Sequence, residues 1–175
     1  MLKLYIAGNL GAATSEAILV DPLKVTAGLT TGIVEIFDKH CDVMGNILNN
    51  SLEFTFSKEN KTETRTFFFR TASFWVGNKN IINFNLLAPN STNTTEKKND
   101  TTVLVYANNM MELKVDAAEE PIVKDIERVK KELSIEVEVE KPDTKQKAQK
   151  KTLEEELVYF EQLLIALREY KKRGK

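Results

Sequence analysis

The hydrophobic period of this chain changes near residue 116, and this change constrains its fold more than any other feature. Before it, apolar and polar residues alternate, as at Leu52, Phe54 and Phe56. A period of two is typical of β-strands, and a period of 3.6 is typical of helices. After it, apolar residues recur at helical steps of four, three, four and three: Leu153, Leu157, Phe160, Leu164 and Leu167. The sequence therefore predicts an α+β protein with two parts, residues 1–115 and 116–175.

The first part is predicted to be an antiparallel β-sandwich. Its short alternating segments are separated by Gly, Pro, Asn or Asp, which are typical of turns. Many short strands at close spacing are typical of a sandwich or a flattened barrel. Residues 89–100 are polar and rich in turn-forming residues, so we expect an exposed loop there. The expected strands are 2–7, 16–20, 23–27, 32–37, 51–57, 63–70, 72–77, 80–87 and 102–107.

The second part is predicted to be a two-helix hairpin. Pro121 suits the first turn of the first helix, and a strand-like alternation follows that helix at 135–140. A Lys-rich connector at 141–151 then precedes a second helix over roughly residues 152–172. The segment 116–140 is acidic overall and the segment 141–175 is basic, so we expect opposite charges to orient the helices side by side. The apolar stripe of the first helix is expected at Ile122, Ile126, Val129 and Leu133.

Composition makes several classes of protein improbable. Hydrophobic residues make up 42% of the chain, enough for a packed core. The net charge of −1 provides no overall attraction to nucleic acid or to anionic lipid. Cys41 is the single cysteine, so a reducing compartment is expected. No signal peptide and no apolar stretch of membrane-spanning length is apparent, so we expect a cytoplasmic protein without direct membrane insertion.

Few side chains in this sequence are suited to catalysis. The single histidine, His40, precedes Cys41, and neighbouring side chains in an extended segment point to opposite faces. His40, Cys41 and Asp42 are consecutive and lack the spacing of zinc ligands. There is no Gly-rich phosphate loop, and the acidic run 154–156 suits the start of a helix. We therefore expect no catalytic residue, no metal and no cofactor.

Three segments resemble the epsilon subunit of F-type ATP synthases. Residues 32–40 follow that family's Gly-polar-apolar-Gly-apolar-apolar-Pro-Gly-His run, with matches at Gly32, Ile36 and His40. Residues 71–75, Thr-Ala-Ser-Phe-Trp, resemble its Ser-Gly-Gly-Phe-Leu, and residues 166–168, Ala-Leu-Arg, resemble the close of its last helix. The order of the β and helical parts also agrees. Residues 89–107 look like an insertion relative to that family.

One of these segments also departs from the family pattern. Ile33, Glu35, Asp38 and Lys39 replace the polar residue, the second Gly, the Pro and the third Gly. In the family this turn lies toward the membrane rotor ring. Because these four residues differ here, the resemblance does not predict contact with a normal ring.

The resemblance implies a non-catalytic subunit of a rotary ATPase, peripheral to the membrane through its complex. In that family the sandwich binds the gamma stalk subunit, and the hairpin packs on it or extends toward the catalytic alpha/beta hexamer. ATP sensing is not expected, since residues 154–160 carry three carboxylates and lack the Arg of the family's ATP-binding pattern. The alternative is a β-sandwich adaptor with a coiled-coil arm in an unrelated complex. Expected partner-interface residues are Gly32, Ile36, His40, Met44, Phe74, Leu157, Leu164 and Arg168.

Overall fold

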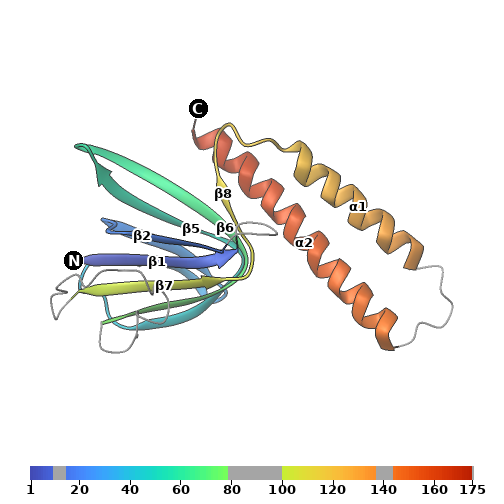
Figure 1. The fold of residues 1–175 in the computed structure, drawn as a ribbon, viewed down its shortest axis with the longest axis horizontal. Helices are drawn as coiled ribbons and strands as arrows, with labels where there is room; N and C mark the ends of the chain where they lie inside the picture. The colour runs from blue at the N-terminus through green and yellow to red at the C-terminus, as the bar shows by residue number, and fades with distance from the viewer. Residues whose placement is uncertain (10–14, 79–99, 137–143, 175) are drawn as a thin grey trace. The chain divides into compact units, whose positions relative to one another are not determined.

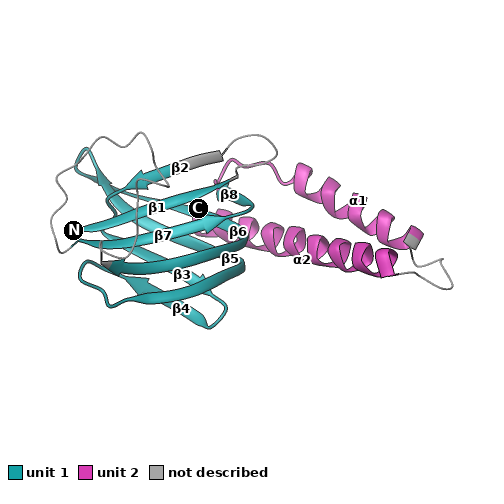
Figure 2. Cartoon of the chain, turned by 60° about the horizontal axis from the view of Figure 1, so that its bottom comes forward, with its two compact units in different colours: residues 1–112 teal, residues 113–175 magenta. Residues whose placement is uncertain are grey.

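The computed structural model describes residues 1–9, 15–78, 100–136 and 144–174. These residues form two compact units, 1–112 and 113–175, which are coloured separately in Figure 2. The first unit is built from β-strands and the second contains both helices (Figure 1). The expected strand at 80–87, most of the expected loop and the segment 137–140 lie outside the described residues.

The strands form one mixed sheet in the order β2-β1-β7-β6-β5-β3-β4, with β8 paired to β6. The pair β1 and β7 is parallel, whereas the other neighbours with a described register are antiparallel. The predicted α+β fold, a β part followed by two packed helices, is confirmed, but the sheet is mixed and not fully antiparallel because β1 and β7 run parallel. The strands are β1 (Leu2–Asn9), β2 (Ser15–Val20), β3 (Lys24–Leu29), β4 (Gly32–Ile36), β5 (Val43–Lys58), β6 (Lys61–Asn78), β7 (Thr101–Ala107) and β8 (Met110–Leu113).

Two long strands, β5 and β6, connect the two halves of this sheet. The β5–β6 pairing keeps one register on both sides of Asn49, which itself has a φ of 45°. Asparagine tolerates this left-handed conformation better than most residues. Before Asn49, β5 lies beside the part of β6 that pairs with β7; after it, β5 pairs with β3. We call these regions the β7 half and the β3 half.

Both halves contribute to one hydrophobic core. The rings of Phe54 and Phe67 stack with their centroids 6.1 Å apart, and the Arg65 guanidinium lies 5.1 Å from the centre of the Phe67 ring. The Nε atom of Arg65 is 2.6 Å from a carboxylate oxygen of Glu112. The alternation seen in the sequence is therefore the alternation between core and surface. Fully buried members include Leu4, Ile6, Val25, Ile36, Leu52, Phe54, Phe69, Phe74, Val103 and Val105.

The second unit contains α1 (Glu120–Glu136) and α2 (Thr144–Arg173), which run antiparallel (Figure 1). Ile122 and Val129 are buried, as the predicted stripe on α1 requires. Helix α2 begins eight residues earlier than expected because the Lys, Gln and Ala residues of the connector are strong helix formers. The alternating residue Ile135 also belongs to α1.

On α2 the buried positions differ in part from the predicted stripe. Leu153 and Leu167 are buried as expected, together with Tyr159 and Leu163. The other members of the predicted stripe, residues 157, 160 and 164, are only partly buried. The helical period was therefore predicted correctly, but the most buried line of residues lies to one side of the expected one.

Candidate partner interface

A row of large apolar side chains crosses the outer surface of the β7 half. Met44 lies directly opposite Trp75, Trp75 opposite Leu104, Leu104 opposite Tyr5, and Tyr5 opposite Leu19. Directly opposed residues on paired strands share one face of the sheet. Met44 is 73% exposed, Leu19 53% and Trp75 40%. Five neighbouring strands thus present one continuous apolar row, part of which is open to solvent.

On the side of this row toward Ser73 and Tyr106, the neighbouring positions carry no formal charge, whereas on its other side Lys3, two residues before Tyr5 on β1, is charged and only 8% exposed. Two further cross-strand neighbours, Ser73 and Tyr106, lie on the same face. Burial, and then the nearby Asp21, raise the pKa of Tyr5, so its hydroxyl stays neutral at physiological pH. We call this surface the neutral face and define it by Tyr5, Leu19, Met44, Asn46, Leu48, Thr71, Ser73, Trp75, Leu104 and Tyr106.

The outer surface of the β3 half, unlike the neutral face, carries charged side chains. There Lys24 Nζ lies 3.0 Å from Glu35 Oε1, and the Thr66 hydroxyl donates a 3.4 Å hydrogen bond to Glu53. Charged residues make up 29% of this chain, and none of the ten residues that define the neutral face is charged. The centres of protein–protein interfaces are depleted of charge and enriched in aromatic residues and Met. The neutral face has this composition, and an exposed apolar patch commonly marks an interaction site.

Of the residues expected at the partner interface, Met44 lies on the neutral face. Phe74 and Ile36 are fully buried members of the core, so their side chains are not available to a partner at the surface. Gly32 begins β4 with a φ of 136°, and a Cβ there would meet no atom within 4 Å. His40 is partly buried and lies in the segment between β4 and β5.

His40 and Cys41 lie closer together than expected. Lys39 has a φ of 63°, and the His40 amide donates to the carbonyl of Phe37, so the chain turns here instead of remaining extended. His40 Nδ1 is 3.7 Å from Cys41 Sγ and 2.8 Å from the Cys41 carbonyl oxygen. The two side chains therefore do not point to opposite faces, but the shorter contact of Nδ1 is with the backbone.

Ion pairs join the two helices of the second unit. Glu119, just before α1, contacts Arg168 at 2.8 Å and Lys171 at 3.2 Å on α2, the acid-to-base direction that the charge pattern predicts. In a second group of ion pairs, the basic residue is on α1 and the acidic residue is on α2. Arg128 contacts Glu156 at 2.7 Å, and Lys130 contacts Glu161 at 2.9 Å. Arg168 is thus engaged within the hairpin, whereas the expected interface residues Leu157 and Leu164 are partly buried on the same helix.

The helix pair is expected to depend on pH through Glu119. Hydrogen bonds from Arg168 and Lys171 lower the pKa of Glu119 below its ordinary value. A carboxyl group with a lowered pKa stabilises the folded state above its unfolded pKa of about 4.3, and this contribution disappears as the pH falls through the folded-state value. Glu119→Gln should therefore reduce the melting temperature slightly at pH 7, by less than about 3 °C for an exposed pair.

Thermal melts followed by circular dichroism at 222 nm, at pH 7 and at pH 3, test this expectation. The difference between wild type and Glu119→Gln should be smaller at pH 3 than at pH 7, because a larger share of the wild-type carboxylate is protonated at the lower pH. Glu120→Gln is the matched control, since Glu120 is an exposed neighbour. An equal effect of both substitutions at both pH values would contradict the role of Glu119.

In the part of the chain that the structure describes, no group of three or more His, Cys, Asp or Glu residues is placed to hold a metal ion. Neither described helix is both long enough and apolar enough to cross a membrane.

Sequence reasoning missed most of the neutral face. Trp75 belongs to the motif at 71–75, but nothing in the sequence placed it opposite Met44 and Leu104. One signal was available: Met44, Asn46 and Leu48 alternate with Ile47, which is buried. Leu19 and Tyr106 come from strands far from β5 in sequence, so only the strand register brings them onto this surface.

Comparison with known proteins shows which fold this chain shares. The sequence matches no family model and no curated protein. The structure matches a chain in the Euglena gracilis mitochondrial ATP synthase, solved with OSCP, F1 and the c-ring, at a TM-score of 0.55 and 16% identity. The match covers 94% of this chain and 81% of that one. This protein has the fold of an ATP synthase chain.

The likeness extends over both units. A β-sheet followed by two packed C-terminal helices fits the epsilon-subunit fold that the sequence motifs resemble. A chain in the Tetrahymena thermophila mitochondrial ATP synthase, from its central stalk and c-ring, also aligns, at a TM-score of 0.45 and 10% identity over 93% of this chain and 96% of that one.

Proposed function

We propose that this chain is a non-catalytic, epsilon-like subunit of the central stalk of an F-type or F-type-like rotary ATPase. In this role it binds a gamma-like stalk subunit and couples or regulates ATP hydrolysis or synthesis. The observation that carries the proposal is the likeness in fold to an ATP synthase chain across 94% of the sequence, including both the sheet and the helices. The three sequence motifs at 32–40, 71–75 and 166–168 support it independently.

The neutral face is the docking surface that we assign to the gamma-like partner. Met44, Trp75 and Leu19 would lose their contact with water on binding, which provides the hydrophobic contribution to affinity. The absence of charge on this face avoids the desolvation cost of buried, unpaired ions. A partner surface that fits it is also apolar and uncharged.

The two helices supply the regulatory part of the proposal. Buried apolar residues of both helices, together with ion pairs between them, join α1 and α2. In the proposed role this helix pair moves as one arm between two docking sites and so favours one rotational state of the machine. The catalytic hexamer is the second partner that we assign to the helices, and the membrane rotor ring completes the complex.

Purification from the native cells tests the proposed function. The full chain carries an affinity tag, is recovered under mild conditions and is analysed with its bound proteins by mass spectrometry. We expect a stalk subunit with a long antiparallel coiled coil and a nucleotide-binding hexamer, in stoichiometric amounts. Recovery of a different complex, without a nucleotide-binding hexamer, would favour the adaptor alternative and overturn the proposal.

The isolated chain is expected to neither hydrolyse ATP nor bind it. The carboxylates of Glu154, Glu155 and Glu156 would repel a triphosphate, and the guanidinium of Arg168, near the far end of the helix, already contacts Glu119. Isothermal titration calorimetry with Mg-ATP should give no binding tighter than about 1 mM, equivalent to roughly −4 kcal/mol. Phosphate release by the purified chain alone, or tighter ATP binding, would contradict this prediction.

A further inference from the structure

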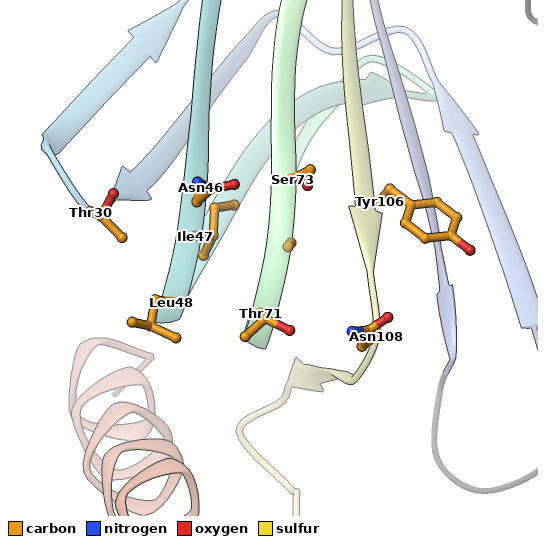
Figure 3. Close-up of a pocket in the computed structure, with 9 residues that line it drawn as sticks. Thr30, Asn46, Ile47, Leu48, Thr71, Ser73, Tyr106 and Asn108 are labelled. Carbon is orange, nitrogen blue, oxygen red and sulfur yellow. The ribbon is translucent and has the colours of Figure 1, made fainter. Parts of the chain in front are cut away.

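A hollow of about 550 Å³ lies at one end of the neutral face, over the first part of β5, the middle of β6 and the end of β7 (Figure 3). Beneath it lie Ile47 and Ala72, which are members of the hydrophobic core and direct their side chains to the opposite face of the sheet. Asn46 and Ser73 lie directly opposite each other in the lining, and Leu48 is directly opposite Thr71. Asn108 continues the lining beyond β7 through its backbone amide, which donates to the Thr71 carbonyl. The hollow therefore combines the exposed apolar side chain of Leu48 with a rim of amides and hydroxyls.

The polar groups of this rim have unused hydrogen-bonding capacity. Among the residues that the structure describes, the side chains of Asn46, Thr71, Ser73 and Asn108 make no hydrogen bond to another residue, and all four residues are exposed. Each amide side chain offers donors and an acceptor, and each hydroxyl offers one donor and two lone pairs. A peptide backbone, with alternating N–H and C=O groups, can pair with such a set.

The lack of charged side chains in the lining narrows the class of ligand further. The lining contains no Lys, Arg, His, Asp or Glu. Phosphates and carboxylates are usually held by charge-assisted hydrogen bonds from cationic side chains, and amines are held by carboxylates. Binding any of them here would desolvate a charge without providing a partner for it. The hollow is therefore suited to an uncharged ligand.

The position of the hollow identifies the source of that ligand. It shares Asn46, Leu48, Thr71, Ser73 and Tyr106 with the neutral face, so a protein docked on that face would also cover the hollow. A partner with an equally uncharged surface complements both. We propose that the hollow receives an uncharged extended segment of the stalk partner, held through its backbone by Asn46, Thr71, Ser73 and Asn108. This inference rests on the proposed function and identifies the chemistry of the segment that binds.

The test uses substitutions that add charge without changing size. The full chain with Asn46→Asp and Asn108→Asp is rebound to the purified parent ATPase from which the native chain has been removed, and the affinity is measured by interferometry. We expect the affinity to fall by at least about tenfold, since two carboxylates would be buried opposite uncharged groups. Asn109→Asp is the matched control, because Asn109 is exposed and adjacent but does not line the hollow. It should bind within about twofold of wild type.

A photo-crosslinking residue at the rim position Thr30 identifies the bound segment in the same complex. We expect a crosslink to one uncharged segment of the stalk subunit and none from the same probe at Thr64, which lies outside the hollow. A crosslink to a charged segment, to a second copy of this chain or to no protein would overturn the inference. So would wild-type affinity of the double variant, and in that case the proposed function would remain. Failure of the wild-type chain itself to rebind would instead overturn the proposed function.

Discussion

Placing a negative charge at both Met44 and Trp75 should release this chain from its parent ATPase. Met44→Glu and Trp75→Glu put two carboxylates directly opposite each other at the β5 end of the apolar row, where residues on paired strands are roughly 5 Å apart. On docking, both would lose water without gaining a counter-ion, so the affinity should fall by about a hundredfold or more. Both side chains are exposed in the chain itself, so the fold should persist.

Recovery of the ATPase subunits with the tagged variant is the measurement, and the far-ultraviolet dichroism spectrum checks the fold. The matched control is Thr55→Glu with Thr64→Glu, a directly opposed pair on the outer surface of the β3 half. It adds the same two charges to the same pair of strands, and it should leave recovery of the complex unchanged. Equal recovery of the complex by the Met44/Trp75 variant and by wild type would show that docking uses another surface.

Truncating Phe67 should cost the sheet unit a large part of its stability. Its ring is almost completely buried, stacks on Phe54 and lies beneath the Arg65 guanidinium. Phe67→Ala should lower the free energy of unfolding by about 3–5 kcal/mol through lost burial and the cavity that remains. Since domains of this size are typically stable by only about 5–15 kcal/mol, the variant should unfold at a much lower urea concentration.

Trp75 provides a direct probe for this measurement. It is the single tryptophan of the chain and lies in the sheet unit, so its fluorescence during urea unfolding follows that unit. Phe37→Ala is the control, because Phe37 is 49% exposed and lies outside the core cluster; it should cost less than about 1 kcal/mol. Similar losses for Phe37→Ala and Phe67→Ala would contradict the assignment of Phe67 to the core.

The comparison of sequence with structure shows where local patterns stop being informative. The alternation at Leu52, Phe54 and Phe56 predicted a half-buried strand, and the structure buries Leu52 and Phe54 completely. The same reasoning began the strand at 51–57 too late: Gly45, Asn49 and Asn50 resemble turn residues, yet β5 begins at Val43 and runs through all three. Pairing with β6 on both sides of Asn49 supplies the hydrogen bonds that outweigh their weak strand propensity.

The candidate interface was predicted less well than the fold. Met44 was chosen from a motif and lies on the neutral face, but Ile36 and Phe74, chosen in the same way, are in the core. A motif records which residues occur together, whereas exposure depends on which face of the strand meets the core. On α2, the helical repeat was clear, but it did not show which line of residues would be most buried.

The sequence by itself determined the α+β class, the order of the β and helical parts and the scarcity of catalytic groups, because each depends on composition or on a period of a few residues. Only the tertiary structure decided that β1 pairs in parallel with β7, almost a hundred residues away, and that β5 and β6 join both halves of one sheet. The neutral face depends on these long-range pairings. Its residues come from five strands, and hydrogen bonding between distant segments, which no local pattern encodes, places Met44, Trp75 and Leu19 in one row.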